Sequence, residues 1–287
     1  MQKYTVIIPT LNAAGTIDAL LDALAGQSLP PDEIVVVASA SDDGTLERAR
    51  AHAGVRAIPI AREAFDHGGT RDMAIRSCDA PIAVLMTQDA LPADASCMAA
   101  LLRPFDDPAV AAVCARQVAR RDATRREAAV RAFRYPDESF TWDRSDIPRM
   151  GIRAYLLSDV CAAYRRSAYL TVGGFEHPIE TNEDMLIASA FLNAGYRLAY
   201  AGEARVWHSH RFTLREEYAR NRKIGAFLAK YADRFRGGGA AGEGLRMVKA
   251  VSANLLKRGR FIEWIAFGFN CLARMLGNRA GRRRGHG

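Results

Sequence analysis

Residues Thr5-Val-Ile-Ile-Pro-Thr-Leu-Asn12 combine a short apolar run with a polar turn. The β-branched residues of this run predict a buried strand over 5–8. Apolar residues then recur three and four positions apart, which predicts a helix over 16–25. The chain therefore begins with a strand, a turn and a helix.

The same alternation continues through the following residues. Further strands are predicted at 33–37, 55–60 and 81–86, with helices at 45–53 and 70–77. Such alternation indicates an α/β fold in which helices flank a mostly parallel sheet. In an open sheet of this kind the ligand lies at the carboxyl ends of the strands. Polar residues that directly follow the strands are therefore the first candidates for a binding site.

Asp89 follows the fourth predicted strand, as Thr10 and Asn12 follow the first and Ser39 follows the second. A carboxylate at this position is costly to bury unless it binds a metal or hydrogen-bond donors. Its hard oxygen atoms suit Mg²⁺ or Mn²⁺. The competing explanation is that Asp89 only caps the next helix.

Two further groups of polar residues have both an ordinary and a functional explanation. Glu183 and Asp184 start a predicted helix over 183–194, where the helix dipole stabilises acids. One of these carboxylates could instead remove the proton of an attacking hydroxyl. His208 and His210 alternate along an extended segment and so share one face. One imidazole could be a nitrogen ligand beside Asp89, or both could be polar surface or satisfied core residues.

His67-Gly-Gly-Thr-Arg71 places two glycines directly before the helix predicted at 70–77. Backbone N–H groups and Arg71 in this position are suited to phosphate or sugar oxygens. A simple loop-to-helix turn is the alternative. The motif is not G-x-G-x-x-G, which counts against a dinucleotide-binding enzyme.

The second half of the chain is less regular. We expect a strand at 110–114, a helix at 124–133, a polar loop at 135–150, short strands at 197–201 and 204–208, and a long helix at 214–235. The glycine-rich stretch 236–244 then interrupts the pattern. The predicted organisation is one domain over 1–235, a linker over 236–244 and a helical tail over 245–287.

The net charge of +8 belongs almost entirely to this tail, where ten basic residues stand against the single acid Glu263. The body is near neutral, so the charge does not indicate a nucleic-acid partner. Residues 261–276 mix aromatic and aliphatic side chains and precede an arginine-rich end. Such a basic amphipathic segment suits an anionic membrane surface. The alternative, equally open, is a helix that packs on the body or on a second subunit.

The five cysteines are scattered without a C-x-x-C pair, so neither a disulfide framework nor a zinc site fits. We therefore expect a reducing, cytoplasmic location. The apolar run at 4–9 is too short for a signal peptide. No uncharged apolar stretch of about 18 residues is present, so no membrane span is expected.

Taken together, these motifs resemble the inverting family 2 glycosyltransferases of the GT-A fold, over residues 4–235. Val6–Asn12 and Glu33–Thr45 resemble the family's nucleotide-binding turns, Thr87–Asp89 its D-x-D metal motif, and Asn182–Asp184 its E-D base motif. The resemblance implies that Asp184 is the general base, with Glu183 beside it. It implies that Asp89 and His208 hold Mg²⁺ or Mn²⁺. The implied nucleotide-sugar site consists of Pro9, Thr10, Asn12, Ser39, His67, Gly68, Gly69, Arg71 and Gln88.

Four motifs are more closely similar to bacterial rhamnosyltransferases of cell-surface polysaccharide synthesis. They are His67–Arg71, Thr87–Ala90, Asp159–Arg165 and Trp207–His210. This resemblance implies a dTDP-rhamnose donor and a lipid-linked or oligosaccharide acceptor. It implies a cytoplasmic enzyme, and the tail leaves open peripheral contact with the inner face of the membrane or a homodimer.

Three departures from the family pattern affect these expectations. Ala38 stands where the family usually has an Asp that pairs with the pyrimidine base, a loss that costs about 1–3 kcal/mol. Thr87 replaces the first Asp of D-x-D, which makes His208 more valuable as a ligand. The Q-x-x-R-W motif of processive relatives is missing, which indicates transfer of one sugar per encounter.

Two other functions fit the sequence less well. A nucleotidyltransferase would be expected to have a basic phosphate-binding loop near its N-terminus, and residues 9–17 contain no Lys or Arg. A non-catalytic nucleotide-sugar-binding relative would fit Ala38. Retention of both Asp89 and Asp184 weighs against it.

Overall fold

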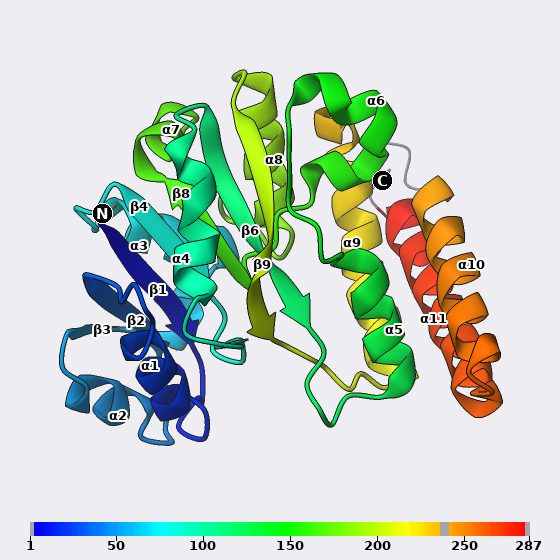
Figure 1. The fold of residues 1–287 in the computed structure, drawn as a ribbon, viewed down its shortest axis with the longest axis horizontal. Coiled ribbons are helices and arrows are strands. Elements are labelled where there is room, and N and C mark those ends of the chain that lie inside the picture. The colour runs from blue at the N-terminus through cyan, green and yellow to red at the C-terminus, as the bar shows by residue number, and fades with distance from the viewer. Residues whose placement is uncertain (1–2, 236–240, 285–287) are drawn as a thin grey trace.

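The computed structural model describes residues 3–235 and 241–284. A single twisted sheet forms its centre, helices cover both faces, and a helical hairpin packs at one side (Figure 1). The α/β fold predicted from the sequence, a mostly parallel sheet flanked by helices, is confirmed.

The parallel half of the sheet comes from the first part of the chain. It consists of β1 (Tyr4–Thr10), β2 (Glu33–Ser39), β3 (Val55–Ile60) and β4 (Ile82–Met86). The other strands are β5 (Leu91–Pro92), β6 (Val110–Val118), β7 (Phe140–Trp142), β8 (Cys161–Arg165) and β9 (Arg197–Trp207). The strand order is β3-β2-β1-β4-β8-β6-β9-β5, and β7 pairs with β9. Strand β8 runs antiparallel to both of its neighbours.

Alternating side chains of the strands form two cores, one on each face of the sheet. Val6 and Ile8 belong to the core that α1 (Ile17–Ala25) and α4 (Cys97–Leu102) cover. Ile7 belongs to the opposite core, with α3 (His67–Arg76) and α8 (Glu183–Asn193). The remaining helices of the body are α2 (Thr45–Ala51), α5 (Arg125–Arg134), α6 (Ile147–Met150), α7 (Arg166–Thr171) and α9 (Leu214–Lys230).

Several predicted boundaries are corrected by contacts that are distant in sequence. The two short strands expected at 197–201 and 204–208 form the single strand β9, because a register shift against β6 absorbs the residues between them. The expected helix over 214–235 ends at Lys230 and is followed by a 3₁₀ turn. The loop expected at 135–150 contains β7 and α6.

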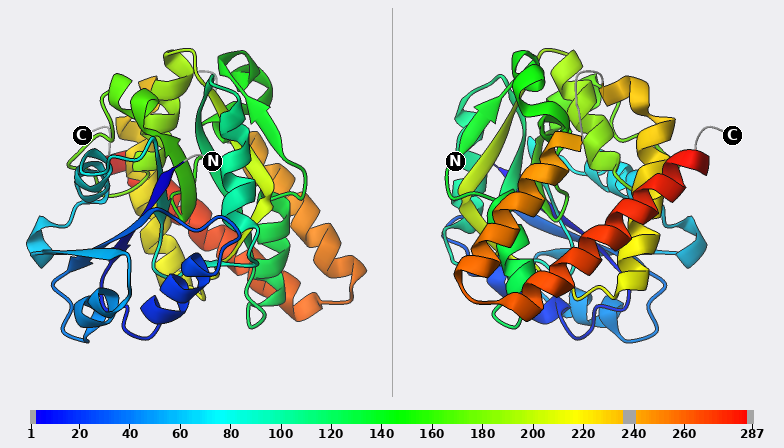
Figure 2. Two further views of the ribbon diagram at one scale, coloured as in Figure 1. Left: turned by 60° about the vertical axis from the view of Figure 1, so that its left-hand side comes forward. Right: turned by 90° about the vertical axis from the view of Figure 1, so that its right-hand side faces the viewer.

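The tail folds as a hairpin of α10 (Ala241–Lys257) and α11 (Phe261–Arg284), and α10 begins inside the predicted linker. Helix α11 lies along α9 (Figure 2). Glycines make this contact possible: a Cβ at Gly281 would lie 2.0 Å from Arg222 O, and one at Gly277 would lie 2.3 Å from Tyr218 O. Within the described residues, each helix is too short or too polar to cross a bilayer.

Candidate active site

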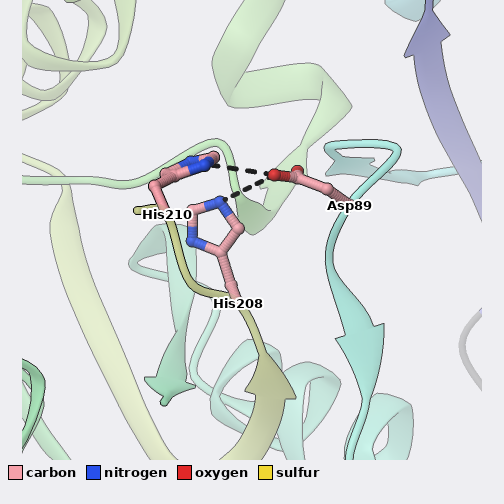
Figure 3. A group of neighbouring side chains, drawn as sticks. All are labelled: Asp89, His208 and His210. Atoms are coloured by element: carbon pink, nitrogen blue, oxygen red, sulfur yellow. Dashed lines mark ion pairs between the residues drawn. The ribbon is translucent and has the colours of Figure 1, made fainter. Parts of the chain in front are cut away.

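Three side chains from two strand ends form a candidate metal site (Figure 3). Asp89 follows β4, whereas His208 and His210 follow β9. Pairing of Leu91 in β5 with Trp207 in β9 brings the two strand ends together. His208 Nε2 lies 3.3 Å and His210 Nε2 lies 3.7 Å from Asp89 Oδ2.

The protonation of this triad fits a divalent cation. Burial alone would raise the pKa of Asp89, but the hydrogen bond and charge of His208 hold it well below its usual range. Burial, together with the charge of His208, lowers the pKa of His210 to about 4, so its imidazole is neutral at pH 7. One carboxylate and two imidazoles suit a first-row transition ion such as Mn²⁺ better than Mg²⁺, which prefers oxygen ligands.

His208 is oriented from behind by Gln117 of β6. Its Nδ1 lies 2.9 Å from Gln117 Oε1, and Gln117 Oε1 also accepts a hydrogen bond from Arg131 of α5. Arg131 Nη1 also lies 3.0 Å from His208 Nδ1. Gln117 and Arg131 together hold the ring so that Nε2 faces Asp89, which is the usual role of polar groups behind a metal-binding histidine.

A second cluster consists of three carboxyl groups around Arg71. The guanidinium of this residue lies 3.2 Å from Glu183 Oε1 and 3.7 Å from Asp159 Oδ2. Asp184 is adjacent on the first turn of α8. Asn182, which precedes the turn, has a φ of 62°. This left-handed conformation is uncommon outside glycine and marks a backbone held by its surroundings.

The charge balance of this cluster favours protonated carboxyl groups. Burial, with the charges of Asp159 and Glu183, raises the pKa of Asp184 well above its ordinary value. Burial raises the pKa of Asp159 to about 7. Among the described residues, Arg71 Nε and Asp159 Oδ2 are buried without a hydrogen-bond partner. The cluster therefore has polar atoms that a ligand can satisfy.

Residues 158–160 join the two clusters. Thr87 N, beside the metal site, donates to Val160 O over 3.1 Å. Gln117 Nε2 donates to Ser158 Oγ over 2.7 Å. Asp159, between them, faces Arg71. One short segment therefore connects the candidate metal site to the carboxyl cluster.

The turn after β1 is held by hydrogen bonds to β2 and to the residues that follow it. Asn12 has a φ of 51°, and its N–H donates to Ser41 Oγ over 3.0 Å. Thr10 Oγ1 donates to Val37 O, and Pro9 lies beside Val37 in the sheet. Ser39 Oγ is buried and has no hydrogen-bond partner among the described residues. This orphaned hydroxyl at the end of β2 is available to a ligand.

Gln88 is committed to the same turn. Its carboxamide accepts from Leu11 N over 2.7 Å and donates to Leu11 O over 3.0 Å. Both polar atoms of the Gln88 side chain thus bond the backbone of the turn. Gln88 therefore ties the turn to the loop that carries Asp89. Its contact with the nucleotide sugar stays a prediction.

The sequence predicted that Gly68 and Gly69 precede a helix. In the structure both glycines lie inside the first turn of α3, because this helix already begins at His67. Asp66 caps this helix by accepting from Gly69 N over 2.6 Å, and it also accepts from Ile179 N. A Cβ at Gly68 would lie 2.3 Å from Glu176 O. The glycines thus allow a close approach of the 176–179 loop. His67 lies at the exposed start of the helix, where its Nδ1 is 3.3 Å from Arg71.

Three residues of the site were not among the sequence candidates: Asp159, Gln117 and Arg131. Asp159 belongs to a motif that pointed to rhamnosyltransferases, so the sequence offered a signal for it. Gln117 and Arg131 lie in an ordinary strand and an ordinary helix, where no local pattern distinguishes them. His210 was recognised beside His208 but was not included among the predicted ligands.

The chain is similar in sequence to known glycosyltransferases. The sequence model of glycosyl transferase family 2 matches residues 5–173. The O-antigen chain rhamnosyltransferase RfbN of Salmonella typhimurium is 38% identical over 283 residues, which cover 98% of this chain and 90% of RfbN. The O-antigen chain rhamnosyltransferase WbaN of Salmonella anatum is 36% identical over 287 residues, with coverage of 98% and 90%.

A solved structure supports the fold. The mannosyltransferase PcManGT of Pyrobaculum calidifontis, in complex with GDP-Man and Mn²⁺, superposes with a TM-score of 0.65 at 21% identity, over 96% of this chain and 87% of PcManGT. The family match spans more than half of the chain and includes the β1 turn, the 67–71 segment and Asp89. The chain is therefore a glycosyltransferase and belongs to glycosyl transferase family 2.

Proposed function

We propose that this enzyme transfers a single rhamnose from dTDP-rhamnose to an acceptor hydroxyl, with inversion, in the synthesis of a surface polysaccharide or glycolipid. The two rhamnosyltransferases at 38% and 36% identity support the sugar. The observation that carries the chemistry is the joining of Asp89, His208 and His210 to the carboxyl cluster through residues 158–160.

Asp184 is the proposed general base. Asp184 lies in the first turn of α8. Because its pKa is raised, it is a stronger proton acceptor than an ordinary carboxylate once it is ionised. Glu183 is held by Arg71 and so positions the base rather than replacing it. A single base that activates the acceptor on the face opposite the leaving group gives inversion.

Asp89, His208 and His210 would hold the metal ion, with Mn²⁺ favoured over Mg²⁺ by the two imidazoles. A divalent cation there supplies neutralisation of negative charge on the departing nucleoside diphosphate. Pro9, Thr10, Asn12 and Ser39 form the proposed nucleoside pocket. Ala38 is buried at its base, so the Ser39 hydroxyl is our candidate for the polar contact that the family Asp would make.

Product analysis with dTDP-rhamnose and Mn²⁺ tests this function. We expect a rhamnoside whose anomeric configuration, measured by NMR, is opposite to that of the donor. Asp184→Asn should abolish transfer while dTDP binding is kept, and Asp79→Asn, at an exposed site, is the matched control. Transfer by Asp184→Asn at the wild-type rate would refute the base assignment. A donor panel in which another nucleotide sugar is the better substrate would refute rhamnose.

We further propose that the hairpin makes peripheral contact with an anionic membrane. The outward face of α11 carries Phe261, Ile265 and Phe269 four residues apart, exposed to 61%, 54% and 55%, with Ile262 beside them at 85%. An apolar stripe of this kind is unusual on a soluble surface. The turn between α10 and α11 lies at the same end of the molecule as the carboxyl ends of β1 and β9 (Figure 1).

Charge decides between a membrane and a second copy of the chain. Exposed basic residues lie at both ends of α11, with Lys257 and Arg258 before it and Arg279 and Arg283 in its last turns. Glu263, on the same helix, is turned inward and paired with Arg126. A symmetric dimer through this face would bring like charges together, whereas anionic lipid headgroups would neutralise them.

Co-sedimentation with vesicles tests the contact. The full chain should pellet with phosphatidylglycerol-containing vesicles and much less with phosphatidylcholine alone. Ile262→Gln combined with Phe269→Gln should weaken binding, while Leu156→Gln, at an exposed leucine outside the hairpin, should not. Equal binding by all three proteins, or a concentration-dependent dimer that the double variant abolishes, would remove the membrane proposal.

A further inference from the structure

A cavity of about 350 Å³ lies behind the histidines of the metal triad, among β6, α5, α9 and α11. Six arginines line it: Arg126, Arg131, Arg134, Arg211, Arg220 and Arg274. Acidic lining residues are limited to Glu127 and Glu217. The cavity also includes Ser158 and Val160, on either side of Asp159, and so reaches the segment that connects the candidate metal site to the carboxyl cluster.

Carboxylates neutralise four of these arginines one to one. The pairs are Arg126–Glu263 at 2.7 Å, Arg131–Glu127 at 3.6 Å, Arg211–Asp122 at 3.2 Å and Arg274–Glu217 at 2.6 Å. Within the part of the chain that the structure describes, Arg134 and Arg220 have no carboxylate partner. Arg220 lies over the ring of Phe212, 5.3 Å from its centroid. Two positive charges of the cavity are therefore left without counter-charge.

Arg134 lines this cavity. Its side chain is accessible to solvent, yet burial, with the charges of Arg274, Arg220 and Arg131, lowers its pKa. The guanidinium therefore lies close to other positive charges of the cavity wall. An arginine remains protonated there at neutral pH, so the cavity keeps its positive charge.

We propose that this arginine cavity binds a phosphate or diphosphate group. Like charges enclosed together are costly unless an anion neutralises them. The planar fork of arginine matches phosphate oxygens, and a volume of about 350 Å³ is within the range of small-ligand sites. The Tyr135 hydroxyl, which also belongs to the lining, is a further polar group of the cavity wall.

Two sources supply such a group: the nucleotide donor and a lipid-linked acceptor that carries a diphosphate. The second source rests on the proposed function. The position of the cavity favours it, because Arg131 contacts Nδ1 of His208 at 3.0 Å, on the ring edge opposite the Nε2 that faces Asp89. The proposed nucleoside pocket after β1 lies instead on the Asp89 side, because Gln88, next to Asp89, is hydrogen-bonded to Leu11 of that turn.

Calorimetry with inorganic pyrophosphate in EDTA tests the cavity without requiring metal or transfer activity. We expect binding to the wild type, and binding about tenfold weaker or more in Arg134→Gln and in Arg220→Gln. Arg50→Gln, at an exposed position on α2, is the matched control and should bind as the wild type does. Without ligand, Arg134→Gln should melt at or above the wild-type temperature, because it relieves repulsion.

Competition separates the two sources. If farnesyl diphosphate displaces pyrophosphate while dTDP with Mn²⁺ binds alongside it, the cavity takes the acceptor, which is the result we expect. If dTDP displaces pyrophosphate and loses affinity in Arg134→Gln, the cavity takes the donor diphosphate.

Pyrophosphate affinity that is undetectable in the wild type, or equal in the wild type, Arg134→Gln and Arg220→Gln, would overturn the proposal. Because no turnover is measured, failure of dTDP-rhamnose as a donor would leave this result standing.

Discussion

Nε2 of His208 lies 3.3 Å from Oδ2 of Asp89, across the gap between the ends of β4 and β9. The other ring nitrogen of His208 is held by Gln117 at 2.9 Å. The histidine is therefore oriented before any ion arrives. This preorganisation gives the first prediction.

Replacement of His208, or of the Gln117 side chain that orients it, should lower the affinity for Mn²⁺. We expect His208→Ala to lose Mn²⁺ binding and Gln117→Leu to weaken it by about 10- to 100-fold, the range typical of groups behind a ligand. Titration of Mn²⁺ by electron paramagnetic resonance measures both. His52→Ala, at a histidine paired with Asp18 outside the site, should bind Mn²⁺ normally. Mg²⁺ binding tighter than Mn²⁺ would contradict the assigned ligands.

The rate of transfer should rise with pH through a range above that of an ordinary carboxyl group. Burial raises the pKa of Asp184, so below that pKa the group is protonated and cannot accept the acceptor proton. His210, with a pKa of about 4, is already neutral above pH 5 and adds no limb there. A kcat profile from pH 5 to 9 measures the effect. A flat profile would argue against Asp184 as the base.

The stability of the fold should fall as pH rises from about 4 to about 7 through the contribution of Asp159. Its folded pKa of about 7 lies above the unfolded value of about 3.9. The folded state therefore holds the proton more tightly between these values, and stability decreases across that window. Asp159→Asn should flatten this part of the curve in thermal melts at several pH values. Asp79→Asn should leave the slope unchanged.

A pair of glycine substitutions on α11 should have opposite effects on stability. Gly281→Ala places a methyl group 2.0 Å from Arg222 O and should destabilise the protein by about 1–3 kcal/mol. Gly268→Ala, on the same helix, meets nothing within 4 Å and should stabilise it by about 0.5–1 kcal/mol. Urea unfolding measures both. Equal effects would mean that α11 does not depend on close contact with α9.

Loss of the Gln88 carboxamide should weaken donor binding more than metal binding. Gln88→Leu removes both hydrogen bonds to Leu11 and frees the turn that precedes Asn12. We expect the KM for the donor to rise by about tenfold, since two polar contacts to backbone are lost. Mn²⁺ affinity should change little, because Asp89 and the histidines are untouched. A fall in kcat alone would indicate that Gln88 acts elsewhere.

The sequence predicted the parallel half of the sheet well, because its signals are local. The β-branched residues at 55–60 give β3 with its observed bounds. The continuity of β9 could not be predicted, because it depends on a register shift against β6, which lies about 90 residues earlier in the chain. The start of α3 depends on a cap from Asp66 that also holds Ile179, a contact across the fold.

The same distinction applies to the site. Asp89 and His208 could be paired from sequence, because strand ends at one edge of a sheet meet. Gln117 and Arg131 could not, since their importance arises only when α5 packs behind His208. The hydrogen bond of Gly69 is unpredictable from sequence for a related reason, because its N–H donates to Asp66, three residues earlier.

The glycine contact between α9 and α11 determines which helices can be exchanged between this protein and other family members. Helix α9 directly follows the segment that carries His208 and His210, and α11 is seated on its backbone at Gly277 and Gly281. An α10–α11 hairpin taken from another family member would therefore pack poorly on this α9, unless the α9 of that relative were transferred with it. Chimeras joined after His210 should fold and keep their metal ligands, whereas those joined at the glycine-rich stretch after Phe235 should lose the interlock. The natural unit of modular exchange in this protein is α9 through α11.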